Sequence, residues 1–123
     1  MLTACVEVAE PTDLSAAGRT CTRKVNKAIA GMGDQYTGQD FVEVGEGGGS
    51  LTVSSPVNGV NGAIVSAIAI GCILQETKAP NYIEGRIQEV TGLEGRQEAS
   101  WGGVTMSYIF DEDNGLSAVL TAD

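Results

Sequence analysis

Residues 104–120 read VTMSYIFDEDNGLSAVL, and this stretch decides the fold class. Apolar side chains recur at every second position from Val104 to Phe110, with Thr105 and Ser107 between them. A period of two is typical of a strand that buries one face. The Asn-Gly pair that follows is typical of a tight hairpin turn, and an apolar run returns after it. The sequence therefore predicts an antiparallel hairpin that turns at the acidic run.

Four further short runs predict strands in the rest of the chain. They are enriched in β-branched or aromatic residues, and glycines or Asn-Gly pairs follow several of them. The predicted strands are residues 4–8, 41–44, 51–54 and 82–90.

One amphipathic helix is predicted near the N-terminus. Pro11 precedes Thr12 and Asp13, either of which can cap a helix, and Gly31 and Gly33 end the pattern. The apolar positions at helical spacing are Leu14, Ala17, Cys21, Val25, Ala28, Ile29 and Met32.

Residues 63–74, AIVSAIAIGCIL, fit two structures. As a strand they place one face of larger residues, Ile64, Ile68, Ile70, Cys72 and Leu74, opposite a face of small ones, Ala63, Ala67, Ala69 and Gly71. As a helix they place a stripe of apolar residues, from Val60 to Gly71, along one side. β-branched enrichment favours the strand, and the run is too short to span a membrane.

These elements together predict an α+β domain, with one helix packed on an antiparallel β-sheet of about six or seven short strands. A chain of 123 residues without an internal repeat or a linker is expected to form a single domain, residues 1–123.

The composition excludes several kinds of chemistry. The chain has no histidine, which excludes a Ser-His-Asp or Cys-His dyad and a haem with a histidine ligand. Seven Lys+Arg stand against 16 Asp+Glu, and the formal net charge is −9. This excess of negative charge disfavours nucleic acids and anionic membranes as partners. We expect no enzymatic activity, no cofactor and no metal ion.

The cysteines are Cys5, Cys21 and Cys72, an odd number without a CxxC motif. We expect three reduced, buried thiols in a reducing compartment and no disulfide framework. No secretory signal is expected, because neither a basic segment nor an apolar run precedes Glu7. The alternative interpretation is that residues 2–5, LTAC, form a lipoprotein cleavage box.

Basic residues are concentrated on the predicted helix. Arg19, Arg23 and Lys27 follow each other at intervals of four, so they line one helix face, and Lys24 lies beside them. Residues 28–77 contain no Lys or Arg. This polarity predicts docking of the basic face onto an acidic surface, in another copy or another protein. The alternatives are a solvated helix face and a phosphate or nucleic-acid contact.

Three aromatic residues are further interface candidates: Trp101, which lies between small residues, and Tyr36 and Phe41, which flank a polar loop. A lone tryptophan is either an interface anchor or a core anchor, so both interpretations stay open for Trp101.

Three other motifs have a weaker functional interpretation. The glycine-rich run at residues 45–49 follows a predicted strand, as a phosphate loop does, but no Lys-Ser/Thr pair ends it. Residues 111–115 contain carboxylates in a partial calcium-loop pattern, but Gly115 falls where the third Asp would be, so a charged hairpin turn is the favoured interpretation. The glutamates at positions 84, 89, 94 and 98 offer carboxylate pairs for acid-base chemistry.

The function that these observations favour is a non-enzymatic structural subunit of a larger assembly. A phage or virus particle is the expected assembly, with the chain as a capsid-decorating (cement) protein or a neck or tail-completion protein. The expected partners are other protein subunits, including further copies, and the expected location is the virion, after synthesis in the host cytoplasm. The alternatives are a small binding module for a ligand or peptide, a carboxylate enzyme and an acidic inhibitor that mimics nucleic acid.

Overall fold

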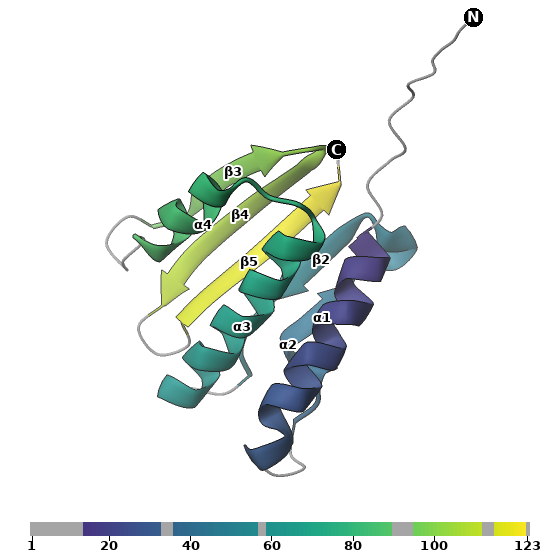
Figure 1. Ribbon diagram of the computed structural model, residues 1–123, viewed down its shortest axis with the longest axis vertical. Coiled ribbons are helices and arrows are strands. Elements are labelled where there is room, and N and C mark those ends of the chain that lie inside the picture. The colour runs from purple at the N-terminus through teal and green to yellow at the C-terminus, as the bar shows by residue number, and fades with distance from the viewer. Residues whose placement is uncertain (1–13, 33–35, 57–58, 90–94, 112–114, 123) are drawn as a thin grey trace, which may run out of the picture.

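The computed structural model describes residues 14–32, 36–56, 59–89, 95–111 and 115–122. In this part of the chain, helices pack on one face of an antiparallel sheet (Figure 1). The helices are α1 (Leu14–Ile29), α2 (Gly38–Phe41), α3 (Val60–Glu76) and α4 (Asn81–Gln88), with 3₁₀ turns at Ala30–Met32 and Glu46–Gly48. The strands are β1 (Val42–Val44), β2 (Ser50–Val53), β3 (Gln97–Trp101), β4 (Val104–Asp111) and β5 (Gly115–Ala122).

The sheet has five strands in the order β1-β2-β5-β4-β3. Every neighbouring pair is antiparallel. The α+β class with an antiparallel sheet is confirmed, but the strands are fewer than the six or seven predicted. The strand predicted at residues 4–8, like the predicted cap at residues 12 and 13, lies outside the described residues.

The hairpin predicted from residues 104–120 is confirmed as β4 and β5. Met106 lies opposite Leu120 and Tyr108 opposite Ala118, and these side chains are buried. Gly115 begins β5 with φ 79°, and a methyl group there would overlap Ala63 of α3. The close approach of α3 therefore explains why this position needs glycine.

The strand interpretation of residues 63–74 is wrong, because the segment forms most of α3. Val65, Ala69 and Ile73 recur at intervals of four and are buried toward the sheet, beside Cys72. Tertiary packing therefore overrides the β-propensity of the isoleucines.

The strand predicted at residues 82–90 is also wrong over its described residues. Pro80 is the N-cap of α4, and Ile83 and Ile87 are buried one helical turn apart. Two helices therefore stand where strands were predicted, and the prediction of a single helix is wrong. The strand that pairs with β4 on the side away from β5 is β3, which follows α4 in the chain.

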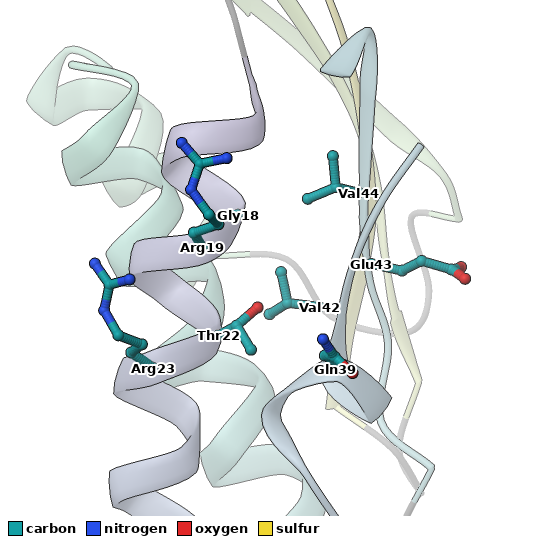
Figure 2. A pocket seen from close by; sticks show the side chains of 8 residues that line it. All are labelled: Gly18, Arg19, Thr22, Arg23, Gln39, Val42, Glu43 and Val44. Atoms are coloured by element: carbon teal, nitrogen blue, oxygen red, sulfur yellow. The ribbon is translucent and has the colours of Figure 1, made fainter. Parts of the chain in front are cut away.

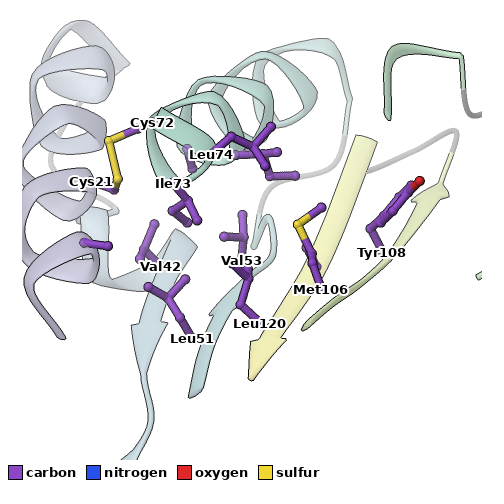
Figure 3. Close-up of a cluster of buried hydrophobic side chains, with 14 of the residues drawn as sticks. Cys21, Val42, Leu51, Val53, Cys72, Ile73, Leu74, Met106, Tyr108 and Leu120 are labelled. Carbon is purple, nitrogen blue, oxygen red and sulfur yellow. A yellow bond between two sulfur atoms is a disulfide. The ribbon is translucent and has the colours of Figure 1, made fainter. Parts of the chain in front are cut away.

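The core lies between the helices and the sheet (Figure 3). Leu51 and Val53 from β2 and Leu120 from β5 point toward Ile73 of α3. All four side chains are buried. One continuous cluster of buried residues therefore joins both layers.

Two cysteines are joined, against the expectation of free thiols. Cys21 of α1 and Cys72 of α3 form a disulfide with a Cα–Cα distance of 5.7 Å (Figure 3). Both are buried, as predicted, but burial places them face to face between two packed helices. The expectation of a reducing compartment loses its basis, because disulfides persist in oxidising environments.

Candidate docking surface

The basic residues of α1 lie on its solvent side, as the spacing predicts. Arg19, Arg23, Lys24 and Lys27 are all exposed, while Cys21 and Val25 face the interior. We call Arg19, Arg23 and Lys27 the basic face, with Lys24 on its flank toward α3. An exposed row of like charges costs the isolated helix a little stability, which an anionic partner would recover.

The neighbouring helix α3 presents apolar side chains to solvent. Ile64 is 53% exposed and Ile68 37% exposed, and Ala67 is exposed between them. We call these three residues the apolar stripe. A helix that is apolar on all sides is usually covered on all sides. The apolar stripe is therefore a surface that water solvates poorly.

The basic face and the apolar stripe lie side by side on the outer surface of the helix layer. The helices run in opposite directions (Figure 1), and the Cys21–Cys72 disulfide sets their register. Lys24 lies one turn beyond Cys21 on α1, and Ile68 lies one turn before Cys72 on α3. A helix rises 1.5 Å per residue, so Lys24 and Ile68 stand at about the same level.

The other face of the sheet differs in chemistry. Of the described helices, none lies over this face (Figure 1). A row of paired residues crosses all five strands there and has a carboxylate at each end: Glu43, Thr52, Val119, Ser107 and Glu98. The next row consists of the hydroxyl residues Ser50, Thr121, Thr105 and Ser100. We call this surface the open sheet face.

The open sheet face is rich in hydroxyl groups and has a carboxylate on each of its edge strands. Glu43 and Glu98 are exposed, and Val119 at its centre is 40% exposed. The basic face of α1 and the carboxylates of Glu43 and Glu98 thus lie on opposite sides of the two-layer structure, and Arg96 lies on the sheet side, where it donates a hydrogen bond to Ser107 Oγ.

A cavity of about 550 Å³ opens between α1 and β1 (Figure 2). Val42 and Val44 point from β1 toward α1, and Glu43 points away from it. Arg19 and Arg23 stand on the α1 side of the cavity. Gly18 lies at its wall, where a methyl group would overlap Val44.

None of the three aromatic interface candidates is fully exposed. Trp101 is 7% exposed, and its indole N–H lies 3.3 Å from the carbonyl oxygen of Thr77. Phe41 is buried, and Tyr36 is half-buried against the core. For Trp101 and Phe41 the structure supports a core role, and neither presents its side chain to solvent.

The weaker motifs gain no chemistry from the structure. Residues 45–49 join β1 to β2, with Gly48 N–H bonded to the Gly45 carbonyl oxygen at 3.1 Å, and no helix follows them. In the described part of the chain, no three Cys, Asp or Glu residues are grouped to hold a metal ion. Residues 112–114 and Glu94 lie outside this part. Glu84, Glu89 and Glu98 are all exposed.

The helix alternative for residues 63–74 contains the apolar stripe, because it places Val60, Ile64, Ala67, Ile68 and Gly71 along one side, although the strand was the favoured interpretation. A further signal for this apolar helix is the absence of any charged residue from Val60 to Gln75. The cavity was missed because nothing in the sequence shows that β1 is an edge strand.

No helix among the described residues is both long and apolar enough to cross a membrane. No family model, curated protein or solved structure matches this chain. The function must therefore be argued from the surfaces themselves.

Proposed function

We propose that the protein is a non-enzymatic structural subunit that works by docking onto other protein subunits, including copies of itself. One observation supports this most directly: an exposed basic face and an uncovered apolar stripe lie side by side on one surface. Apolar side chains contribute binding free energy when they are covered, and charges select the partner and its orientation.

Stacking of copies follows from the polarity of the two-layer structure. The helix layer carries the basic face, and the opposite side presents Glu43 and Glu98 on the open sheet face. Contact between two different faces of the same chain is heterologous, so it continues from copy to copy into rings or extended arrays.

For the assembly itself we propose a phage or virus particle, with the chain as a decoration (cement) protein or a neck or tail-completion protein. The buried disulfide supports an assembly that persists outside a reducing cytoplasm. The net charge of −9 supports protein partners in preference to nucleic acid or an anionic membrane.

The test is a measurement of size by sedimentation velocity at two protein concentrations and two salt concentrations. We expect association that grows with protein concentration and weakens with salt, because exposed charges are screened. Arg19→Glu, Arg23→Glu and Lys27→Glu, introduced together, should leave the circular dichroism spectrum unchanged and abolish the association.

The matched control reverses the three cations that lie outside α1: Lys78→Glu, Arg86→Glu and Arg96→Glu. It makes the same change in net charge but leaves the basic face intact. Because Arg96→Glu also makes the open sheet face more acidic, the control should retain or strengthen the association. A monomer at both concentrations, in a sample that also fails to bind a particle or tail, contradicts the proposal. Equal loss in both triple variants shows an effect of net charge and contradicts docking through the basic face.

A small binding module for a ligand or peptide is the second candidate. The cavity between α1 and β1 favours it, because its volume lies in the range of small-molecule sites. A monomeric protein whose thermal unfolding temperature rises with an acidic peptide, and falls back with Arg19→Glu, would favour this function over assembly.

A further inference from the structure

The edge of β1 that faces away from β2 pairs with no strand in the described part of the chain. Gly45 N–H bonds to the Ser50 carbonyl oxygen, and Ser54 N–H bonds to the Phe41 carbonyl oxygen. The backbone groups of alternate residues in an antiparallel strand point the same way. The N–H and carbonyl groups of Glu43, which is paired with Thr52, therefore also face β2.

The backbone groups of Val42 and Val44 therefore face outward. Val42 N–H is bonded to the Gly38 carbonyl oxygen. This leaves the Val42 carbonyl group and both groups of Val44 directed at the free edge. An exposed edge of this kind is a template for a further strand.

The cavity beside this edge fits the side chains of such a strand. Residues paired across neighbouring strands point to the same face, so side chains opposite Val42 and Val44 would enter the cavity. Its wall at Gly18 and the two valines is apolar, which favours small branched side chains. Arg19 and Arg23 at its rim favour carboxylates nearby.

One segment of the chain has this chemistry. Residues 4–8 read ACVEV, in which Ala4, Val6 and Val8 alternate with Cys5 and Glu7. Residues 1–13 contain three carboxylates and no Lys or Arg. In extended form the segment has Ala4, Val6 and Val8 on one face, and Glu10, in the same alternation, supplies the carboxylate that matches the two arginines.

We propose that the groove between α1 and β1 accepts residues 4–8 of a second copy as a sixth strand, with Val6 and Val8 in the cavity. The proposal rests on the proposed function, since it names one contact by which copies assemble. Each copy then donates a segment and accepts one. Such an exchange builds a head-to-tail chain, or a closed dimer if it is mutual.

The geometry disfavours the same segment of the same chain. Figure 1 shows α1 in front of the sheet and running opposite to β5. The edge strand β1 is antiparallel to β2, which is antiparallel to β5, so β1 also runs opposite to α1. A parallel strand beyond β1 that led into α1 would make a left-handed crossover, whereas about 98% of such connections are right-handed.

If residues 4–8 of the same chain formed an antiparallel strand beside β1, residues 9–13 would have to run back along the whole strand in extended form to reach α1. Five residues span at most about 18 Å. The segment of a second copy is subject to neither constraint, because it is not connected to α1 of the copy that accepts it.

The test uses disulfide trapping in the full chain. Glu43 lies on the open sheet face of β1, the same face that Cys5 would occupy when Val6 and Val8 enter the cavity. Glu43→Cys in a glutathione redox buffer should form a disulfide between Cys5 of one copy and residue 43 of another. The matched control is Glu98→Cys, which places the same thiol on the same face but on β3, the opposite edge.

We expect Glu43→Cys to form linked dimers or longer ladders at least about tenfold faster than Glu98→Cys, because pairing raises the local thiol concentration. Cys5→Ser in the Glu43→Cys chain should reduce the rate to the control level. Val6→Asp with Val8→Asp should do the same, whereas Leu2→Asp with Thr3→Asp, outside the segment, should not.

Equal rates for Glu43→Cys and Glu98→Cys overturn the proposal, as does an unchanged rate after Val6→Asp with Val8→Asp. A disulfide from Cys5 to the thiol at position 43 of the same chain, seen as a shifted monomer band, overturns the assignment to a second copy. Association of copies without selective trapping supports docking through the basic face and contradicts strand donation. Selective trapping that persists, although more slowly, in the Arg19, Arg23 and Lys27 triple variant supports strand donation and contradicts docking through the basic face, because Arg19 and Arg23 contribute only their charge to the groove.

Discussion

Helices α1 and α3 pack side by side on the same sheet face and share a disulfide, yet they meet solvent differently. The outer side of α1 carries Arg19, Arg23 and Lys27, which water solvates well. The outer side of α3 carries Ile64 and Ile68, which water solvates poorly. Burial in the core therefore explains only the inner half of α3, while α1 is fully accounted for as a surface helix.

This difference teaches that the two helices contribute different things to a contact. Covering the apolar stripe provides binding free energy without direction, because the hydrophobic effect is non-directional. The basic face provides orientation, because charges attract one kind of surface and repel another. A surface with only one of these properties would bind weakly or without selectivity.

The largest effect on the packing of α1 against α3 is expected from removal of the disulfide that joins these helices. It closes a loop between residues 51 positions apart, and this constraint on the unfolded chain corresponds to about 4 kcal/mol. Cys21→Ser with Cys72→Ser should lower the free energy of unfolding by roughly that amount, measured by guanidinium denaturation without a reductant.

Cys5→Ser is the control for the disulfide prediction and should leave stability unchanged. Adding a reductant to the natural chain should reproduce the loss, and it should not affect the double variant. A double variant as stable as the natural chain would show that packing alone holds α1 against α3.

The two sides of α3 should respond very differently to truncation. Ile73 is buried over the sheet, so Ile73→Ala should cost about 2–5 kcal/mol through lost burial and a cavity. Ile64 is 53% exposed, so Ile64→Ala should cost less than about 1 kcal/mol in a monomer. Thermal and chemical unfolding at low protein concentration measures both.

The same pair of variants also tests the docking surface. Ile64→Ala should weaken association, measured by sedimentation, although it hardly changes the free energy of unfolding. A loss of monomer stability with Ile64→Ala comparable to that with Ile73→Ala would show that the apolar stripe is covered within the chain.

The hairpin and α1 could be predicted because their signals are local. The period of two in β4, its Asn-Gly turn and the spacing of the apolar and basic residues of α1 all act within a few residues. The exposed positions of Arg19 and Arg23 followed from the same spacing. For these elements, local preference and tertiary packing agree.

The rest depends on contacts that are distant in the chain. The apolar residues of α3 occur on all sides, so their helical period is hidden, and β-branched side chains then favour the wrong structure. Pro80, followed by Glu84, did mark the start of α4 and could have been used. The Cys21–Cys72 bond could not be predicted, because a separation of 51 residues says nothing about closeness in space.

The smallest of these effects concerns the inner side of α3. Among the described residues, Ser66 is the buried polar side chain whose hydroxyl has no hydrogen-bond partner. An unpaired buried hydroxyl costs about 1–3 kcal/mol, part of which Ser66→Ala should recover. We expect this substitution to raise the free energy of unfolding by about 1 kcal/mol, since the methyl group fits where the hydroxyl lies. Ser54→Ala at an exposed position should change nothing. If Ser66→Ala lowers the free energy of unfolding instead, the Ser66 hydroxyl has a hydrogen-bond partner. The inner side of α3 then depends on a polar contact as well as on apolar packing.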